Sequence, residues 1–249
     1  MSRSVHAYES KRKQSDQPII DALLALVEKY PSYGFRKLYV LLRRQGHHWN
    51  HKRVYRIYCG LKLNSRRRRK KRLSNRNPQP LSVPDAINQS WSIDFMSDAL
   101  WDGRRFRVFN VVDDYNREGL DIEIDLSLPA QRVVRVLERI SERRGYRQQI
   151  RLDNGPEMVS ATLAEWADEH GITLEFIKPG KPTQNSFVER FNRTYRQEVL
   201  DSYIFETLDQ VRAFTAKWLR EYNEQRPHES LGDVPPVEYR RMNLAESPV

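Results

Sequence analysis

The chain has almost no cysteine and no long apolar stretch among its 249 residues. Its single cysteine, Cys59, excludes a disulfide framework and any zinc site built from several cysteines, and it fits a reducing compartment. No segment approaches the ~18 consecutive apolar residues that a membrane-spanning helix needs, and the basic start lacks the apolar core of a signal peptide. We therefore expect a soluble, cytoplasmic protein without a membrane anchor.

Motifs for covalent catalysis and for nucleotide binding are missing as well. The sequence has no Ser-His-Asp or Cys-His arrangement and no glycine-rich phosphate loop, so it implies neither a protein nucleophile nor ATP. His47, His48 and His51 lie near Cys59. Without a second cysteine or paired spacing, they are more simply interpreted as polar residues than as a metal site.

Basic charge is abundant and unevenly distributed. Residues 1–84 contain 21 Lys and Arg against 4 Asp and Glu, a net charge of +17, whereas residues 85–249 contain 22 against 29, a net charge of −7. The chain is longer than most single domains, so two units are expected. The first is predicted to bind a polyanion, and the second to be a globular domain that concentrates carboxylates.

Three short helices are predicted near the start of the chain. After a flexible basic segment at 1–17, the apolar spacing favours helices over 18–29, 35–45 and 50–58. A tight turn before the last of them is typical of a helix-turn-helix unit, so residues 18–62 are predicted to form a small all-α DNA-binding domain.

The third helix carries the candidate DNA contacts of this domain. Asn50 can cap it by accepting amide protons of its first turn. Lys52, Arg53 and Arg56 then lie on the helix that would face DNA. Two alternatives stay open at this stage: a helical bundle whose basic side chains are only solvated, and DNA binding without base-specific readout.

Residues 63–84 are predicted to form an extended linker. Seven basic residues follow one another from position 66 to position 72, and two prolines come shortly after them. Like charges repel and proline interrupts regular structure, so the segment should be extended and should bind phosphates with salt-sensitive affinity. Its candidate DNA contacts are Arg66, Arg67, Arg68, Arg69, Lys70 and Lys71.

Residues 85–240 are predicted to form an α/β core with a helical extension at its end, followed by a tail at 241–249. Alternation of apolar and polar residues, or a helical period, predicts strands over 91–95, 105–112, 120–126, 150–153 and 172–177, and helices from 129 and over 161–170, 186–200 and 207–223. In the helix over 186–200, Phe187, Phe191 and Tyr195 form the expected packing stripe.

Three acids stand out within this core. Asp94 alternates with Trp91, Ile93 and Phe95, so its carboxylate should point away from the apolar face of a strand. Asp153 stands at the end of another strand, directly before Asn-Gly-Pro. Glu189 lies early in a helix on whose polar face Asn192, Arg193 and Arg196 also lie, and 35 residues separate it from Asp153.

Three convergent carboxylates suit hard divalent cations. Mg²⁺ prefers carboxylate, phosphate and water oxygens. Two such ions can clamp the attacking and leaving oxygens of an in-line phosphoryl displacement without a protein nucleophile. The alternative is that the three are ordinary surface charges, since Asp and Glu are commonly exposed.

The sequence around these acids resembles the catalytic core shared by retroviral integrases and bacterial insertion-sequence transposases. The resemblance covers roughly residues 19–240 and rests on WSIDF (91–95), VVDDYNR (111–117), DNGPE (153–157) and KPGKPTQNSFVERFN (178–192), together with the 35-residue spacing. The stretch YNEQRPHESL (222–231) is similar to insertion-sequence transposases made from a second reading frame. Several matching segments make the resemblance specific.

The resemblance implies a ribonuclease-H-like fold, a mixed five-stranded sheet flanked by helices. It implies that Asp94, Asp153 and Glu189 are the catalytic acids and bind two Mg²⁺ ions, with Mn²⁺ as a substitute. Asp113 and Asp114 would remain outside this triad and act structurally. Arg193 and Arg196 lie four and seven positions after Glu189, which puts them on its side of the helix within reach of DNA phosphate. Arg196 also stands where the family has a basic DNA-contacting residue; the alternative for it is a local ion pair with Glu189 or Glu198.

The implied activity is cleavage of double-stranded DNA at the ends of an insertion element, followed by strand transfer of the 3′-hydroxyl. The implied partners are the terminal repeats, target DNA, further copies of the chain and an upstream first-frame DNA-binding region, all at the nucleoid. Two alternatives remain. A retroelement integrase would carry a histidine-and-cysteine zinc site that is missing here, and a non-catalytic repressor would not need the three acids.

Overall fold

The computed structural model describes residues 12–64, 84–155, 157–177 and 185–245. The chain divides into two units, residues 1–74 and 75–249, and each is described by itself. The basic run expected to contact phosphate, residues 66–72, lies outside the described residues.

Helices form the described part of the first unit. They are α2 (Arg12–Lys29), α3 (Phe35–Arg44) and α4 (His51–Gly60). Their apolar stripes meet in one core that includes Leu23, Leu38, Leu42 and Val54. Asn50 caps α4 as predicted, because its Oδ1 accepts a hydrogen bond from the backbone N of Lys52 at 2.9 Å.

Helix α2 begins at Arg12, so the prediction of a flexible segment over residues 1–17 is wrong for residues 12–17. The sequence suggested a start at Pro18 because the helical spacing of apolar residues begins at Ile19. Pro18 instead lies inside the helix. A tertiary contact favours the extra turn: Asp16 accepts hydrogen bonds from Arg53 and Arg56 of α4.

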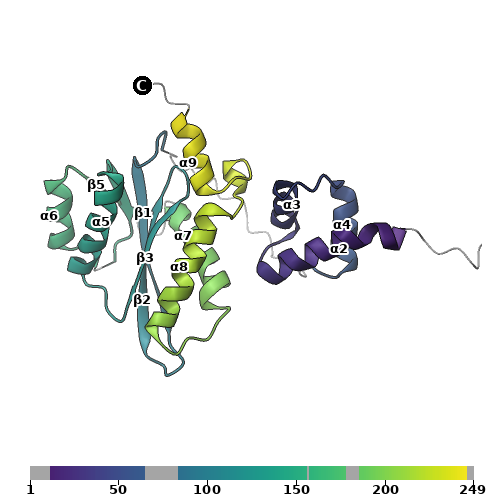
Figure 1. Ribbon diagram of the computed structural model, residues 1–249. Helices are drawn as coiled ribbons and strands as arrows, with labels where there is room; N and C mark the ends of the chain where they lie inside the picture. The colour runs from purple at the N-terminus through teal and green to yellow at the C-terminus, as the bar shows by residue number, and fades with distance from the viewer. Residues whose placement is uncertain (1–11, 65–83, 156, 178–184, 246–249) are drawn as a thin grey trace, which may run out of the picture. The chain divides into compact units, whose positions relative to one another are not determined.

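A five-stranded mixed sheet forms the centre of the second unit (Figure 1), as predicted. Its strands are β1 (Ser90–Ala99), β2 (Arg105–Asp113), β3 (Gly119–Asp125), β4 (Gln149–Leu152) and β5 (Thr173–Phe176). Their order is β3-β2-β1-β4-β5. The first three pair antiparallel, whereas β4 runs parallel to both β1 and β5.

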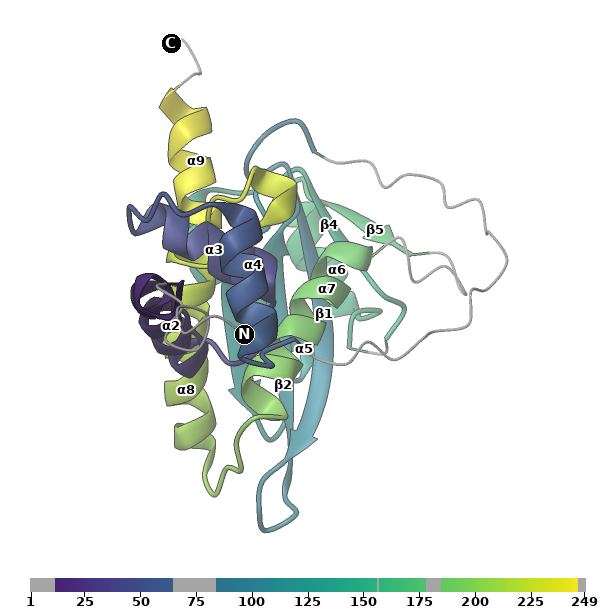
Figure 2. The same ribbon diagram turned by 90° about the vertical axis from the view of Figure 1, so that its right-hand side faces the viewer.

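Helices cover both faces of this sheet (Figures 1 and 2). On one face, α5 (Ala130–Arg144) and α6 (Ala161–Glu169) pack on Trp91, Ile93 and Val111. On the other, α7 (Ser186–Tyr195), its π-helical continuation η2 (Arg196–Leu200) and α8 (Leu208–Glu224) pack on Val108 and Val112.

The chain continues through η3 (Glu229–Leu231) into α9 (Pro236–Ala245). The predicted tail at 241–249 is therefore helical up to Ala245. Asn116 on the β2–β3 turn donates to the carbonyl O of Pro236 at 3.4 Å, and the Tyr115 and Tyr239 rings lie 5.7 Å apart. These contacts are too distant in sequence for local periodicity to detect.

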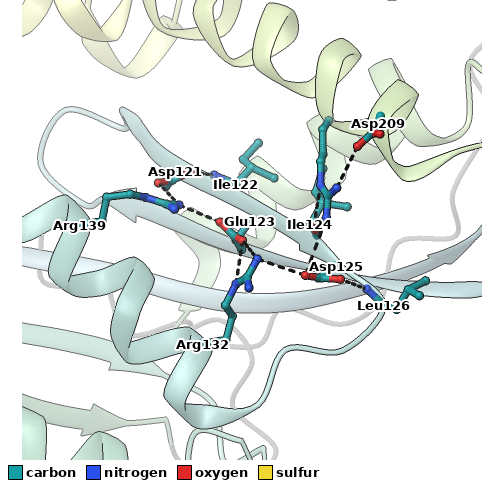
Figure 3. A network of polar contacts seen from close by, with 10 residues as sticks. Asp121, Ile122, Glu123, Ile124, Asp125, Leu126, Arg132, Arg139 and Asp209 are labelled. Carbon is teal, nitrogen blue, oxygen red and sulfur yellow. Dashed lines mark hydrogen bonds and ion pairs between the residues drawn. The ribbon is translucent and has the colours of Figure 1, made fainter.

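The edge strand β3 carries acids on its α5 side (Figure 3). Glu123 pairs with Arg132 and Arg139 of α5, each at 2.8 Å, while Ile122 and Ile124 pack on the opposite face. An edge strand with charged, paired side chains resists pairing with another sheet.

Candidate active site

Strands β1 and β4 bring Asp94 and Asp153 together. In their parallel ladder Trp91 lies opposite Ile150, and Ser92 lies opposite Arg151. Two further steps of this register place Asp94 beside Asp153, with both side chains on the same face of the sheet. Asp94 is half-buried in β1, and Asp153 is half-buried directly after β4 ends.

A tight turn holds Asp153. Its Oδ1 accepts a hydrogen bond from the backbone N of Gly155 at 3.0 Å. A Cβ on Gly155 would lie 3.0 Å from the same oxygen, which is closer than most real contacts. Glycine therefore allows the backbone to approach the carboxylate.

Glu189 lies in the first turn of α7 and is half-buried. Val188, Phe191 and Tyr195 bury the opposite face of the helix. The predicted stripe is wrong at Phe187, which is half-buried and stacks against the Arg117 guanidinium at 3.4 Å. Directly before the helix, buried Asn185 donates to the carbonyl O of Ile93 at 3.3 Å and so ties the start of α7 to β1.

The three acids interact electrostatically. Burial, together with the charges of Asp153 and Glu189, raises the pKa of Asp94 to about 6, against the effect of hydrogen bonds from the Phe95 backbone and Asn192. Repulsion of this kind is relieved by a bound cation. The donors are all carboxylate oxygens, the chemistry that Mg²⁺ prefers. Within the described residues, no group of three Asp, Glu, His or Cys side chains is arranged so that it could hold a metal ion as it stands.

Two asparagines support Asp94, and one of them was missed in the sequence. Asn192 of α7 donates from Nδ2 to Asp94 Oδ2 at 2.7 Å, and its own Oδ1 accepts from Nδ2 of Asn110 at 2.7 Å. Asn110 is fully buried in β2. A single polar residue within Val108-Phe109-Asn110-Val111-Val112 was the available signal.

A buried ion pair lies beside the acids on the same face. Arg151 Nη1 donates to Asp114 Oδ2 at 3.0 Å, and Ser90 and Ser92 also donate to this carboxylate. Asp113 accepts from the backbone N of Asn88 and of Tyr115, at 2.9 and 2.8 Å. Asp113 and Asp114 thus have the structural role that was expected of them.

The basic residues of α7 and η2 differ in how freely they could contact DNA phosphate. Arg193 is exposed. Arg196 instead donates to Asp98 Oδ2 at 3.2 Å and to the carbonyl O of Ser97 at 2.9 Å. The sequence led us to consider an ion pair of Arg196 with Glu189 or Glu198; the structure pairs it with Asp98 of β1 and, at 3.8 Å, with Asp201.

The stretch from Tyr222 to His228 supports the helix that carries Glu189. Arg226 Nη1 binds Glu198 of η2 at 2.6 Å, and Asn223 exchanges hydrogen bonds with the backbone of Gly119 at 2.8 and 2.9 Å. The ring of Tyr222 meets that of Phe191 edge-on at 4.9 Å. These contacts hold α7, η2 and α8 together on the sheet.

The candidate DNA contacts of the first unit are only partly free. Arg53 and Arg56 both bind Asp16, at 2.7 and 2.6 Å, whereas Lys52 is exposed. The six linker residues from Arg66 to Lys71 lie outside the described residues. Among the helices that the structure describes, none is both long enough and apolar enough to cross a membrane.

Comparison with known proteins finds an integrase core domain and an HTH-like domain in this chain. The family described as integrase core domain matches residues 84–182 and 170–236, and the HTH-like domain family matches residues 13–71. A 31.7 kDa protein of insertion element IS407 from Burkholderia multivorans is 42% identical over 245 residues, which cover 98% of this chain and 88% of that protein. The "Putative transposase for insertion sequence element IS986/IS6110" of Mycobacterium tuberculosis is 26% identical and covers 87% of this chain and 84% of its own length.

A solved structure shares the fold. It is the simian T-cell lymphotropic virus intasome in complex with PP2A regulatory subunit B56 gamma, with a TM-score of 0.53 at 15% identity over 90% of this chain and 74% of that chain. The integrase core and HTH-like matches, together with the extent of the IS407 relative, place the chain in the family of bacterial insertion-sequence transposases with an integrase core domain.

Proposed function

We propose that the chain cleaves phosphodiester bonds at the ends of its insertion element and transfers the freed 3′-hydroxyl into target DNA. The observation that carries this proposal is that Asp153, after β4, and Glu189, in α7, lie near enough to Asp94 of β1 for their charges to raise its pKa. An ordinary acid on the solvated surface keeps a pKa near its usual value. A raised pKa beside other carboxylates therefore favours a functional site over a surface charge.

The proposal assigns a role to each acid. Asp94 and Asp153 would hold one Mg²⁺ ion between them, and Glu189 would complete a second site with either carboxylate. Two such ions, with Mn²⁺ as a substitute, would supply stabilisation of charge on the attacking and leaving oxygens of an in-line displacement. Asn192 and the Gly155 amide keep the two aspartates oriented for this task.

DNA binding in this proposal falls mainly on basic residues outside the acid cluster. Lys52 and the 66–71 run would contact phosphate in the first part of the chain, and Arg193 would do so beside Glu189. The chain would act at the nucleoid as several copies on paired element ends, together with an upstream first-frame DNA-binding region. Counterion release would make this binding sensitive to salt.

Asp153→Asn tests the assignment. Asparagine keeps the size of the side chain and an acceptor for the Gly155 amide, but it removes the charge that would bind a cation. Strand transfer should fall by roughly 10³-fold, since a metal site supplies several kcal/mol of transition-state stabilisation. The measurement uses radiolabelled duplexes carrying the ends of the encoding element, a plasmid target and Mg²⁺ or Mn²⁺.

Asp168→Asn is the matched control, because Asp168 is an exposed acid on α6. It should retain full activity, and both variants should bind the duplexes as wild type does. EDTA should abolish the wild-type reaction. Turnover by Asp153→Asn equal to wild type would remove Asp153 from the site, and full wild-type activity in EDTA would exclude the metal-dependent reaction.

A further inference from the structure

Asn110 lies opposite Asp94 in the antiparallel ladder between β1 and β2. The two residues are register partners, and Asn110 is fully buried. Its neighbours at alternate positions, Val108 and Val112, belong to the apolar cluster under α7 and α8. An apolar side chain would suit this position better, because a buried amide costs free energy unless its polar atoms are paired.

The amide of Asn110 is in fact only half paired. Its Nδ2 donates to Asn192 Oδ1 at 2.7 Å, but its Oδ1 has no hydrogen-bond partner among the described residues. An unsatisfied buried polar atom costs about 1–3 kcal/mol. The position therefore carries a stability cost that its packing does not explain.

The hydrogen bond from Asn110 fixes which way the Asn192 amide points. An asparagine side chain has one acceptor oxygen and one donor nitrogen. Since Asn110 binds the oxygen of Asn192, the nitrogen of Asn192 faces Asp94 Oδ2, at 2.7 Å. The other oxygen of Asp94 accepts from the backbone N of Phe95 at 2.8 Å. Both carboxylate oxygens are thereby oriented.

We propose that Asn110 is a positioning residue for the catalytic acid Asp94: it sets the orientation of the Asn192 amide, and through Asn192 it holds the Asp94 carboxylate ready to bind a cation. This inference rests on the proposed function of Asp94. In a purely structural role, Asn110 and Asn192 would only hold α7 on the sheet. Substitution of Asn110 would then change stability without changing metal affinity.

Asn110→Val tests the inference, since valine favours strands and cannot donate a hydrogen bond. Positioning by Asn110 predicts that the folded state is kept or stabilised, while the affinity for Mg²⁺ or Mn²⁺ falls about 10- to 100-fold, as is typical for groups that orient metal ligands. Affinity is read from the shift of Tm in a titration with each ion alone, and strand transfer is measured in parallel.

A double variant isolates the route through Asn192. Asn192→Ala should lower metal affinity, and adding Asn110→Val to it should lower the affinity no further, because residues in one hydrogen-bond chain are not additive. Thr215→Val is the matched control. Thr215 makes another buried polar tie in the same cluster, to Tyr195 at 2.7 Å, but does not reach Asp94. Thr215→Val should change Tm without changing metal affinity.

Asn110→Ala replaces Asn110→Val if valine prevents folding. Wild-type metal affinity in either Asn110 variant, or a full additional loss in the double variant, would overturn the inference. Failure of the proposed function looks different: the wild-type chain itself would show neither a metal-induced shift of Tm nor strand transfer.

Discussion

Arg53 and Arg56 are positively charged, but their charges are already paired within the protein and are not freely available to DNA phosphate. Both lie on α4, where a helix-turn-helix unit would face DNA, and both bind the carboxylate of Asp16. The Asp16 side chain is only 14% exposed, and Arg53 also donates to the Ser15 backbone O at 2.7 Å. Phosphate must therefore compete with an internal carboxylate for these two arginines.

Asp16→Asn is predicted to strengthen binding to random duplex DNA. The amide removes the competing charge, and two partly exposed ion pairs of up to about 1 kcal/mol each correspond to a gain of roughly two- to thirtyfold. The steepness of the salt dependence should increase as well, because two more cations become available to phosphate. Fluorescence anisotropy at several salt concentrations measures both quantities.

Asp21→Asn is the control for this prediction. Asp21 lies on the same helix, is exposed, and accepts a hydrogen bond from Gln17 at 2.8 Å. The Asp21→Asn variant therefore changes the net charge by the same amount as Asp16→Asn, without releasing Arg53 or Arg56. An equal gain in both variants would show that only net charge matters.

At the residue scale, sequence alone could single out Asp94, Asp153 and Glu189 as candidate site residues, because each stands out from a periodic apolar pattern within a specific motif. It could not assign partners. Asn110 meets Asn192 across 82 positions, and Arg196 meets Asp98 across 98. Such pairs depend on strand register and helix packing, which local periodicity does not contain.

At the scale of elements, Gly119 determines how closely α7 and α8 approach the sheet. It begins β3. A Cβ there would lie 2.6 Å from Leu219 Cδ1 and 2.7 Å from Phe191 Cε2. Both distances are far below van der Waals contact, so any larger residue must displace a helix or a side chain.

Gly119→Ala is predicted to destabilise the protein by about 1–3 kcal/mol, the usual cost of overpacking a core. Phe191 follows Glu189 by two positions on α7, so strand transfer should also fall at temperatures where the variant is folded. Urea unfolding and the duplex assay measure the two effects. Gly60→Ala is the control, because no atom lies within 4 Å of the Cβ it adds; an equal loss of stability there would contradict the steric explanation.

From α2 to α8, the strands and helices were predictable in type and order because their patterns are long and strongly periodic, whereas α9 was not predicted. Their ends were less so. Helix α2 gains residues through Asp16, and the predicted helix over 186–200 turns π-helical from Arg196 onward. In that turn, Glu198 accepts hydrogen bonds from Trp218 and Arg226. Contacts distant in sequence thus decided boundaries that propensity alone placed elsewhere.

At the scale of the whole molecule, the two parts of the chain use their basic residues differently. In the integrase unit many arginines are held by acids, as in the β3 network, the Arg151–Asp114 pair and the Arg226–Glu198 pair. Residues 1–84 have only 4 acids for 21 basic residues, a net charge of +17, whereas residues 85–249 have a net charge of −7. Non-specific affinity for DNA should therefore depend on the first part.

Replacing Arg66 and Arg67 with Gln is predicted to weaken binding to any duplex and to flatten its salt dependence. Each phosphate contact contributes about 0.9 to the slope of log affinity against log salt, so losing two contacts should reduce the slope by up to about 1.8. Terminal-repeat and scrambled duplexes should lose affinity alike, because phosphate contacts carry no sequence information. Titrations between low and physiological salt give the slope directly.

The control removes two charges from the integrase unit with Lys217→Gln and Arg220→Gln, both exposed on α8. The two double variants have the same net charge, so a long-range effect of charge would change their slopes equally. Contact with phosphate at the 66–71 run predicts instead that the linker variant alone loses slope. An unchanged slope in the linker variant would mean that this run is only solvated, and the salt-sensitive affinity would then have to come from Lys52, Arg193 and the other exposed cations.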